Sequence, residues 1–322
     1  MENRINYLDN IKGFAIILVV LGHSYSNTNI LTNWLNAFHM PLFFVVSGFL
    51  IAYNKKLEYK LSKKIKSIMI PYIVFSLVLG GFIGVLRYQS DICELLIYMK
   101  NVLFLIVTLQ GYSVCWFLAC LFVSEIIFIF LLRNTNKFRT YIFISIYIVS
   151  IILPNNIFYP VSRILLATFY LYLGYVLNNI NKIEKINLFY YFILVLIHMY
   201  LCNLNGSITV MTMNLNSKIL FIVSSILGIL LVWGLFKMYI SNEMKFLTYF
   251  GKNSIIIMLT HVIFIEIIKL LDYKINLGIC NLGYAEGIIV TQIVLLLEIP
   301  TIFIMNKYFY YLFGKKKQAI SD

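Results

Sequence analysis

A lysine and a histidine in the first apolar segment are the residues of this chain best placed to do chemistry. Lys12 and His23 are eleven residues apart, which in an α-helix is three turns plus about 20° and roughly 16 Å of rise. Both side chains therefore face the same way, one near a membrane surface and one deeper. Ionisable groups inside a membrane are costly and are interpreted as functional by default, so we look for the active site here.

General base catalysis is the chemistry that His23 can supply. A hydroxyl is a poor nucleophile at neutral pH, so a reaction in which it attacks needs a base within hydrogen-bond reach, and a neutral imidazole is the usual choice. A serine esterase is a weaker alternative, because no GxSxG sequence occurs and Ser24 cannot share the face of its neighbour His23.

The elements that must position these residues are membrane helices. Of the 322 residues, 61% are apolar and 12% are charged, and the mean hydropathy is +0.88, whereas a soluble domain has about twice that charged fraction. We therefore predict an all-α polytopic helix bundle in a lipid bilayer, forming one domain over residues 1–322. Ten spans are expected, near residues 8–26, 38–53, 67–86, 113–132, 140–153, 161–177, 188–204, 217–237, 248–271 and 284–312.

The distribution of positive charge predicts the orientation of the chain. With the amino terminus inside, the lysines between Lys55 and Lys66 and the run Lys315 to Lys317 fall in cytoplasmic segments, as the positive-inside rule requires. This indicates an N-in, C-in protein of the cytoplasmic membrane. The net charge of +13 is explained by topology, and nucleic acid is not an expected partner because no soluble basic domain is present. The basic residues left in outer segments are Arg87, Lys100, Lys218 and Lys274.

Two further ionisable residues lie inside predicted spans. Glu125, in the middle of the fourth span, is a candidate catalytic residue that either orients His23 as a carboxylate partner or pairs with Arg163 of the sixth span. His261, in the ninth span, is interpreted as a packing contact between helices. The four histidines lack metal-ligand spacing and the five cysteines form no CxxC pair, so no metal site is predicted.

Residues at the predicted outer surface are candidates for substrate binding. His39 precedes Pro41 at the outer start of the second span and either faces a substrate or caps the interface. Trp116, at the outer edge of the fourth span, either stacks on a sugar or anchors the helix at the interface. Ser47-Gly48 is interpreted as a surface where the second helix approaches the first, and the glycines of Gly80 to Gly84 are likewise assigned to packing.

Several motifs occur in order along most of the chain, and together they resemble one family. That family is the acyltransferase-3 type of membrane acyltransferase, whose members O-acylate the sugars of surface glycans. The motifs are Leu8-Asp9-Asn10-Ile11-Lys12-Gly13, Gly22-His23-Ser24, His39-Met40-Pro41-Leu42-Phe43-Phe44, Ser47-Gly48-Phe49-Leu50, a basic stretch before Pro71-Tyr72, Trp116-Phe117-Leu118, and Gly251-Lys252-Asn253-Ser254 leading to Thr260-His261.

The resemblance implies transfer of an acyl group, usually acetyl, from cytoplasmic acyl-coenzyme A to a hydroxyl of a cell-surface or exported glycan, for example a lipid-linked sugar. The intramembrane histidine of the family matches His23, its preceding basic residue matches Lys12, and its two arginines three residues apart map onto Lys63 and Lys66. Lysine at all three positions keeps the charge but loses the bidentate fork of arginine. The resemblance implies that Lys12, Lys63 and Lys66 bind the phosphates of the donor; the alternative interpretation of each is a positive-inside topology marker. Acyl-coenzyme A is implied as a donor substrate, with no cofactor permanently bound.

A glycan export permease is the alternative function, since relatives with this architecture have been assigned that role and ten polar-lined spans suit a transporter. An acyltransferase needs His23 as a base, whereas a permease should survive its loss. Paired half-repeats with broken helices, which many transporters show, are not found. The high content of isoleucine, lysine and asparagine is typical of an AT-rich bacterial genome, so a bacterial source is expected.

Overall fold

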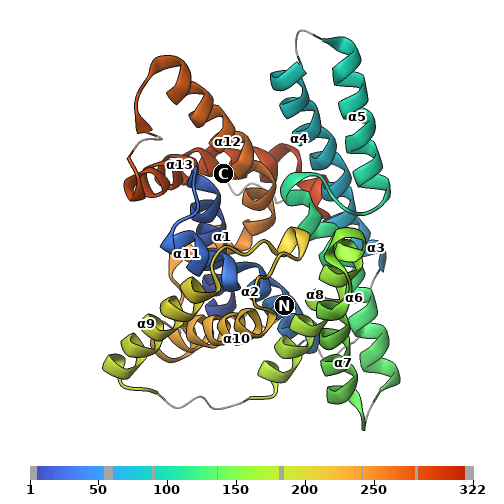
Figure 1. Cartoon of the computed structure of the whole chain (residues 1–322), viewed down its shortest axis with the longest axis vertical. Helices are drawn as coiled ribbons and strands as arrows, with labels where there is room; N and C mark the ends of the chain where they lie inside the picture. The colour runs from blue at the N-terminus through green and yellow to red at the C-terminus, as the bar shows by residue number, and fades with distance from the viewer. Residues whose placement is uncertain are drawn as a thin grey trace. The chain divides into compact units, whose positions relative to one another are not determined.

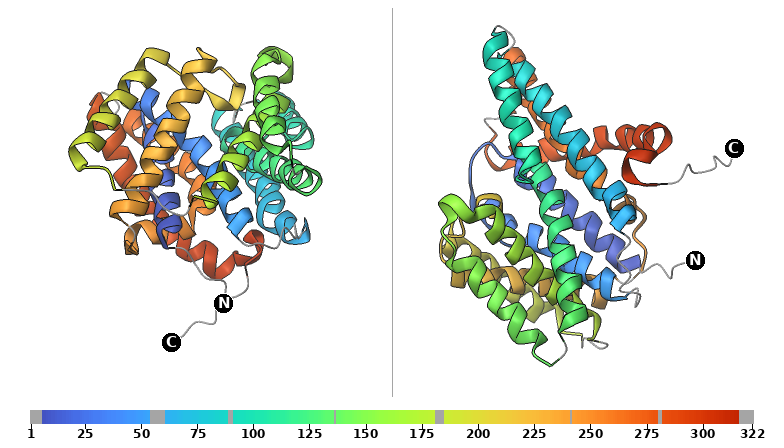
Figure 2. Two further views of the ribbon diagram at one scale, coloured as in Figure 1. Left: turned by 90° about the horizontal axis from the view of Figure 1, so that it is seen from below. Right: turned by 90° about the vertical axis from the view of Figure 1, so that its right-hand side faces the viewer.

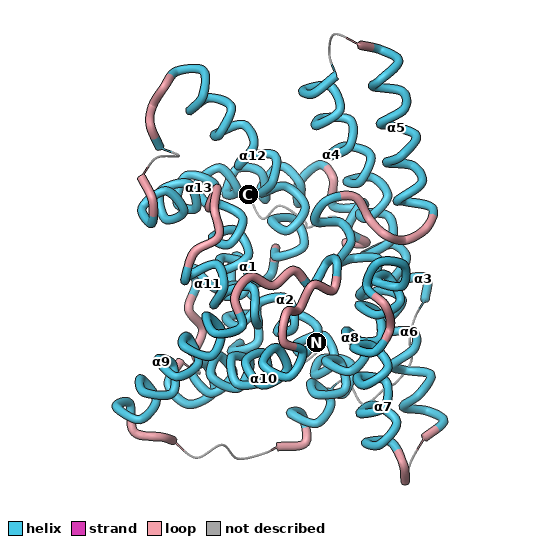
Figure 3. Tube along the Cα trace, in the orientation of Figure 1, coloured by secondary structure: helices cyan, strands magenta, loops and turns pink. Residues whose placement is uncertain are grey.

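The computed structural model of this protein describes residues 6–53, 61–88, 91–135, 137–180, 185–240, 242–279 and 282–315, without the side chains of 155–157. These residues are predominantly helical and contain no strand (Figure 3). Within them, eight helices are long and apolar enough to cross a membrane. The predicted all-α class and multi-pass membrane character are therefore confirmed.

The first and fifth predicted spans are helices that fall outside this group of eight. The first is α1 (Asn6–Ser24), whose first two turns carry Asp9 and Lys12 among other polar residues. The fifth is α7 (Arg139–Ile152), whose 14 residues correspond to about 21 Å of helix. A hydrocarbon core is about 30 Å thick, so α7 is short for a complete span.

Within the domain predicted over the whole chain, contacts define two compact units, residues 1–56 with 169–299 and residues 57–168 with 300–322. The first unit contains α1, α2 (Ile30–Tyr53), α9 (Leu188–Asn205), α10 (Lys218–Gly234), α11 (Lys245–Lys252) and α12 (Ser254–Ile275) (Figure 1). The second contains α3 (Leu61–Lys64), α4 (Ile70–Tyr88), α5 (Ile92–Val107), α6 (Trp116–Asn134) and α7. Both units take residues from α8 (Asn155–Asn178) and α13 (Tyr284–Tyr308).

The first unit is built around α1, which packs against α11, α2 and α12. Two glycines allow α1 and α11 to touch through their backbones: a Cβ on Gly13 would lie 2.0 Å from a main-chain oxygen of α11, and one on Gly251 would lie 1.9 Å from the Asp9 oxygen. The buried amide of Asn10 accepts a hydrogen bond from the Thr248 hydroxyl at 2.9 Å. The motifs that begin at Leu8 and at Gly251 are thus one packing interface.

A second close approach joins α2 and α8. A Cβ on Gly48 would lie 2.0 Å from the main-chain oxygen of Leu171, and a Cβ on Gly174 would lie 2.0 Å from that of Val45. Glycines at these positions remove the side chains that would hold the two helices apart. The predicted packing role of Gly48 is confirmed, but its predicted partner, the first helix, was wrong.

The helix α2 begins eight residues before the predicted start of the second span. Its amino terminus is capped reciprocally, because Asn29 Oδ1 accepts from the main-chain N–H of Thr32 at 2.9 Å and Thr32 Oγ1 accepts from that of Asn29 at 2.7 Å. Pro41 therefore lies inside the helix, where it removes one main-chain hydrogen bond. The predicted start was wrong because Pro41 was taken as a first-turn residue, and His39 consequently lies within the helix.

The ninth predicted span is divided into two helices. Asn253 interrupts the helical path between α11 and α12 with φ −115° and ψ 15°, and its side chain donates to the Tyr249 main-chain oxygen at 2.9 Å. The prediction of one continuous helix from residue 248 was wrong because α11 packs against α1 through Gly251 before the membrane span starts.

In the second unit, α4 and α5 lie side by side (Figures 1 and 2). A Cβ on Gly80 would lie 2.6 Å from the Val102 side chain, and one on Gly84 would lie 3.0 Å from Tyr98. The predicted packing role is confirmed for Gly80 and Gly84. Gly81, between them, would have no atom within 4 Å of an added Cβ.

Candidate active site

The predicted catalytic base, His23, lies beside a second histidine. His23 is the penultimate residue of α1, and its side chain is exposed. Its ring centroid is 5.3 Å from that of His261 on α12, with 47° between the ring planes. His39 on α2 is within the range of electrostatic interaction with His23. We refer to His23, His39 and His261 as the histidine cluster.

The two buried members of the cluster are oriented by their own helices. Nδ1 of His261 is 2.7 Å from the Ile257 main-chain oxygen, and Nδ1 of His39 is 2.6 Å from that of Leu35. A carbonyl oxygen can only accept, so Nδ1 carries the proton in each ring, and Nε2 of the neutral ring is an acceptor. Nε2 of His261 is buried and has no hydrogen-bond partner within the described part of the chain.

The segment that follows His23 is fastened to α13. Both the main-chain N–H and the hydroxyl of Ser26 donate to the Glu286 carboxylate, the former at 3.1 Å. The Tyr25 ring packs on Gly287, where a Cβ would lie 2.3 Å from it. Burial raises the pKa of Tyr25 and the charge of Glu286 adds to the rise, so the phenol stays protonated and donates to a main-chain oxygen of α13 at 3.3 Å. These contacts fix the end of α1 that carries His23.

A buried carboxyl group fixes α12 at the level of the cluster. Thr260, which precedes His261, donates to the Glu298 carboxylate of α13 at 2.7 Å, and the side chain of Glu298 is fully buried. The sequence pattern indicated helix packing for His261 and did not place it beside His23. The available signals were the Thr260-His261 motif and the position of an ionisable side chain inside a membrane span.

Lys12 occupies the place that the helical spacing predicted. Helix α1 is continuous from Asn6 to Ser24, so Lys12 and His23 share a face. Lys12 is partly exposed and its Nζ is 2.6 Å from the Asp9 carboxylate, one turn earlier. Part of its charge is thereby compensated, and its donor-binding role stays a prediction.

The basic segment of the second unit consists of α3 and a π-helical turn, Ile65–Met69. Lys63 and Lys66 are exposed, and no ion pair of either is found among the residues described. π-Helical turns are frequent at functional sites. The geometry leaves these two lysines available for an anionic ligand, as their predicted role requires.

Glu125 on α6 is paired with a residue that sequence analysis did not consider as its partner. Its carboxylate oxygens lie 2.8 and 2.7 Å from Nζ of Lys64, which lies between Lys63 and Lys66 in the sequence. Glu125 is 1% exposed, so the pair is buried at its acidic end and anchors the basic segment to α6. A catalytic role of Glu125 stays a prediction.

Trp116 is the first residue of α6 and is buried. The guanidinium of Arg163 lies 5.3 Å from the centroid of its ring, a distance typical of a cation–π contact. Arg163 also donates to the main-chain oxygen of Gln110 at 2.6 Å. A sugar that stacks on Trp116 would have to share the ring with Arg163, and the predicted contact with a sugar stays a prediction.

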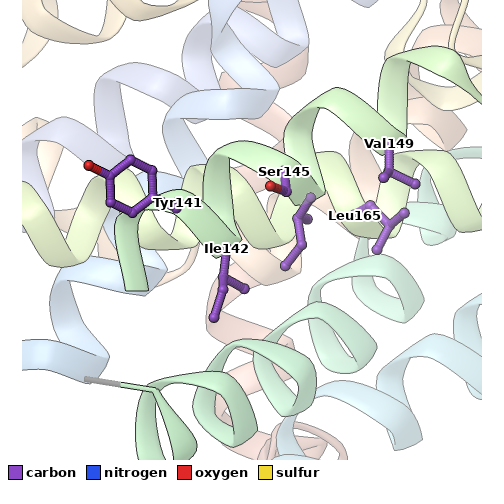
Figure 4. Close-up of a pocket in the computed structure, with 6 residues that line it drawn as sticks. Tyr141, Ile142, Ser145, Val149 and Leu165 are labelled. Carbon is purple, nitrogen blue, oxygen red and sulfur yellow. The ribbon is translucent and has the colours of Figure 1, made fainter. Parts of the chain in front are cut away.

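A pocket of about 320 Å³ in the second unit is unsuited to chemistry (Figure 4). Apart from the hydroxyls of Tyr141 and Ser145, its lining is aliphatic and offers no base or cation. Such a lining is complementary to an apolar hydrocarbon chain and not to a polar substrate. The lining residues are Tyr141, Ile142, Ser145, Ile146, Val149 and Leu165.

The fold and the cluster together define a multi-pass membrane protein in which one accessible imidazole lies among two buried ones. The chain belongs to the acyltransferase-3 family, because the model of that family, described as an acyltransferase domain, matches residues 5–314. A search of curated proteins and a search of solved structures each found no match. The protein is thus a membrane acyltransferase, as its motifs predicted.

Proposed function

We propose that this protein transfers an acetyl group from cytoplasmic acetyl-coenzyme A to a hydroxyl of a cell-surface or exported glycan, in the cytoplasmic membrane of a bacterium. Membership of the acyltransferase family supports the class of reaction. The single observation that carries the proposed site is the accessible ring of His23 at the end of a fixed helix, in contact with His261. The acceptor is proposed as a glycan or a lipid-linked sugar.

His23 is the proposed general base. The acceptor hydroxyl gives its proton to a ring nitrogen of His23 while its oxygen attacks the thioester carbonyl. The carbon–sulfur bond then breaks, and the departing thiolate takes the proton from His23 to give free coenzyme A and the ester. This cycle needs an imidazole that substrate can reach, which His23 provides and the buried ring of His261 does not.

Donor binding is proposed for Lys12, Lys63 and Lys66. Coenzyme A carries several phosphate charges, and lysine recognises phosphate as a point charge. The exposure of Lys63 and Lys66 supports this role. The Asp9 carboxylate beside Lys12 weakens its attraction for an anion, so we expect Lys12 to contribute less than the other two.

The test compares surface glycans from a strain that lacks the gene, complemented with wild-type protein, His23→Ala or His198→Gln at equal membrane levels. O-acetyl esters are measured by NMR before and after mild base. His198 is a matched control because it is a buried histidine of the same unit that accepts a hydrogen bond from Trp34 at 3.0 Å and lies outside the cluster. Wild type and His198→Gln should restore base-labile esters, and His23→Ala should not.

Three results would contradict the proposal. Full acetylation with His23→Ala would remove His23 from the mechanism. Glycan that is exported without esters in every strain would exclude this acceptor class, and loss of export itself in the gene-deficient strain, restored by His23→Ala, would favour the permease.

A further inference from the structure

An unused hydrogen-bond acceptor lies next to the proposed catalytic base. His261 is fully buried, its Nδ1 is committed to the Ile257 oxygen at 2.7 Å, and its Nε2 has no partner within the described residues. Leaving a buried polar atom unsatisfied is destabilising. The exposed imidazole of His23 lies beside this acceptor, so a donor can reach Nε2 during the reaction.

The ring in contact with His261 that can supply such a donor is His23, with centroids 5.3 Å apart. We propose that His261 is a positioning residue for His23: its Nε2 accepts an N–H of His23 and so selects the tautomer whose other nitrogen faces the acceptor hydroxyl. The inference rests on the proposed acyl transfer. It gives His261 the orienting role that sequence analysis considered for Glu125.

The proton balance of the step is simple. One nitrogen of His23 holds a proton that it shares with Nε2 of His261, and the other takes the proton of the acceptor hydroxyl. The resulting imidazolium returns that second proton to the leaving thiolate. His261 keeps its own Nδ1 proton throughout, since the Ile257 oxygen holds it. The arrangement resembles a base oriented by a third group in hydrolase triads, with a neutral imidazole in place of a carboxylate.

Kinetics of two variants of unlike chemistry separate positioning from packing. His261→Phe keeps the ring but has no acceptor, whereas His261→Gln can place an amide oxygen near the site of Nε2. In proteoliposomes with acetyl-coenzyme A, we expect His261→Phe to lower kcat on the order of 100-fold with KM for the donor unchanged. His261→Gln should recover to within about tenfold of wild type. Equal loss in both variants, or no loss in His261→Phe, would overturn the proposal.

His198 again provides a matched control. It is buried and its Nε2 also lacks a partner among the described residues, but its Nδ1 accepts from Trp34, so its free nitrogen is a donor. His198→Phe should change the thermal midpoint of unfolding in detergent. It should leave kcat within about twofold of wild type, because His198 takes no part in the proposed general base catalysis. A loss of kcat equal to that of His261→Phe would contradict a specific role for His261.

A spectroscopic measurement keeps the inference testable if variants fail to fold. The chain contains four histidines, so ¹⁵N-histidine labelling gives four resolvable rings in lipid bilayers. In wild type we expect His23 in a single tautomer, with a through-space correlation to Nε2 of His261, and in His261→Phe a mixture of tautomers. Absence of the correlation would overturn the proposal. A wild-type protein that shows it but transfers no acetyl group would instead refute the proposed function.

Discussion

The histidine cluster of the first unit and the basic segment of the second unit are held in place by different forces. Main-chain oxygens orient His39 and His261, and backbone contacts at glycine fix the helix that carries His23. The basic segment is joined to α6 by the ion pair between Lys64 and Glu125. Neutral contacts are insensitive to ionic strength, whereas exposed charges are screened within about 10 Å at 0.1 M salt. The proposed base, which needs fixed geometry, and the proposed donor site, which needs charge, are thus built differently.

The largest effect is expected where the cluster depends on backbone contact. In Gly251→Ala the added Cβ would lie 1.9 Å from the Asp9 oxygen, so α1 and α11 must separate, and we expect a loss above about 3 kcal/mol, the upper range for overpacking. The measurement is the yield and the thermal midpoint of protein purified in detergent. Gly81→Ala is the control, because its Cβ would meet nothing within 4 Å. Equal yields and midpoints for the two variants would contradict this comparison.

A smaller effect is expected from the ion pair. Glu125→Gln leaves Lys64 without its carboxylate partner. Breaking a fully buried ion pair costs about 3–5 kcal/mol of unfolding free energy. Because the Lys64 side chain is 32% exposed, we expect a smaller loss of about 2 kcal/mol. The double variant Lys64→Met with Glu125→Leu should recover most of this loss, since an apolar replacement is often neutral.

A double-mutant cycle of thermal midpoints measures the coupling between Lys64 and Glu125. Additive losses would show that the contact does not stabilise the fold. The kcat of the double variant also tests the catalytic role predicted for Glu125, because a stable but inactive protein would support that role and a stable, active one would exclude it.

The sequence predicted the spans and their residues better than the contacts between them. Lys12 and His23 share a helix, so spacing alone related them. The contact of His23 with His261 depends on how α12 packs against α1, which no local pattern encodes. Lys64 stood in a lysine-rich stretch, and only the packing of α6 shows that it, rather than its neighbours, is bound by Glu125. The predicted start of the second span was wrong because proline is tolerated both at a helix start and inside a membrane helix, so Pro41 did not mark the boundary.

The smallest effect concerns the two exposed lysines. Lys63→Gln and Lys66→Gln each remove one solvated charge, so we expect KM for acetyl-coenzyme A to rise about fivefold, near 1 kcal/mol, with kcat unchanged. Raising salt should reduce the difference between wild type and variants, since screening acts on exposed charges. Lys274→Gln removes the same charge from a segment predicted to be external and should leave KM unchanged. If all three variants raise KM equally, net charge rather than a donor site explains the effect, and the contrast between the two regions would rest on the ion pair alone.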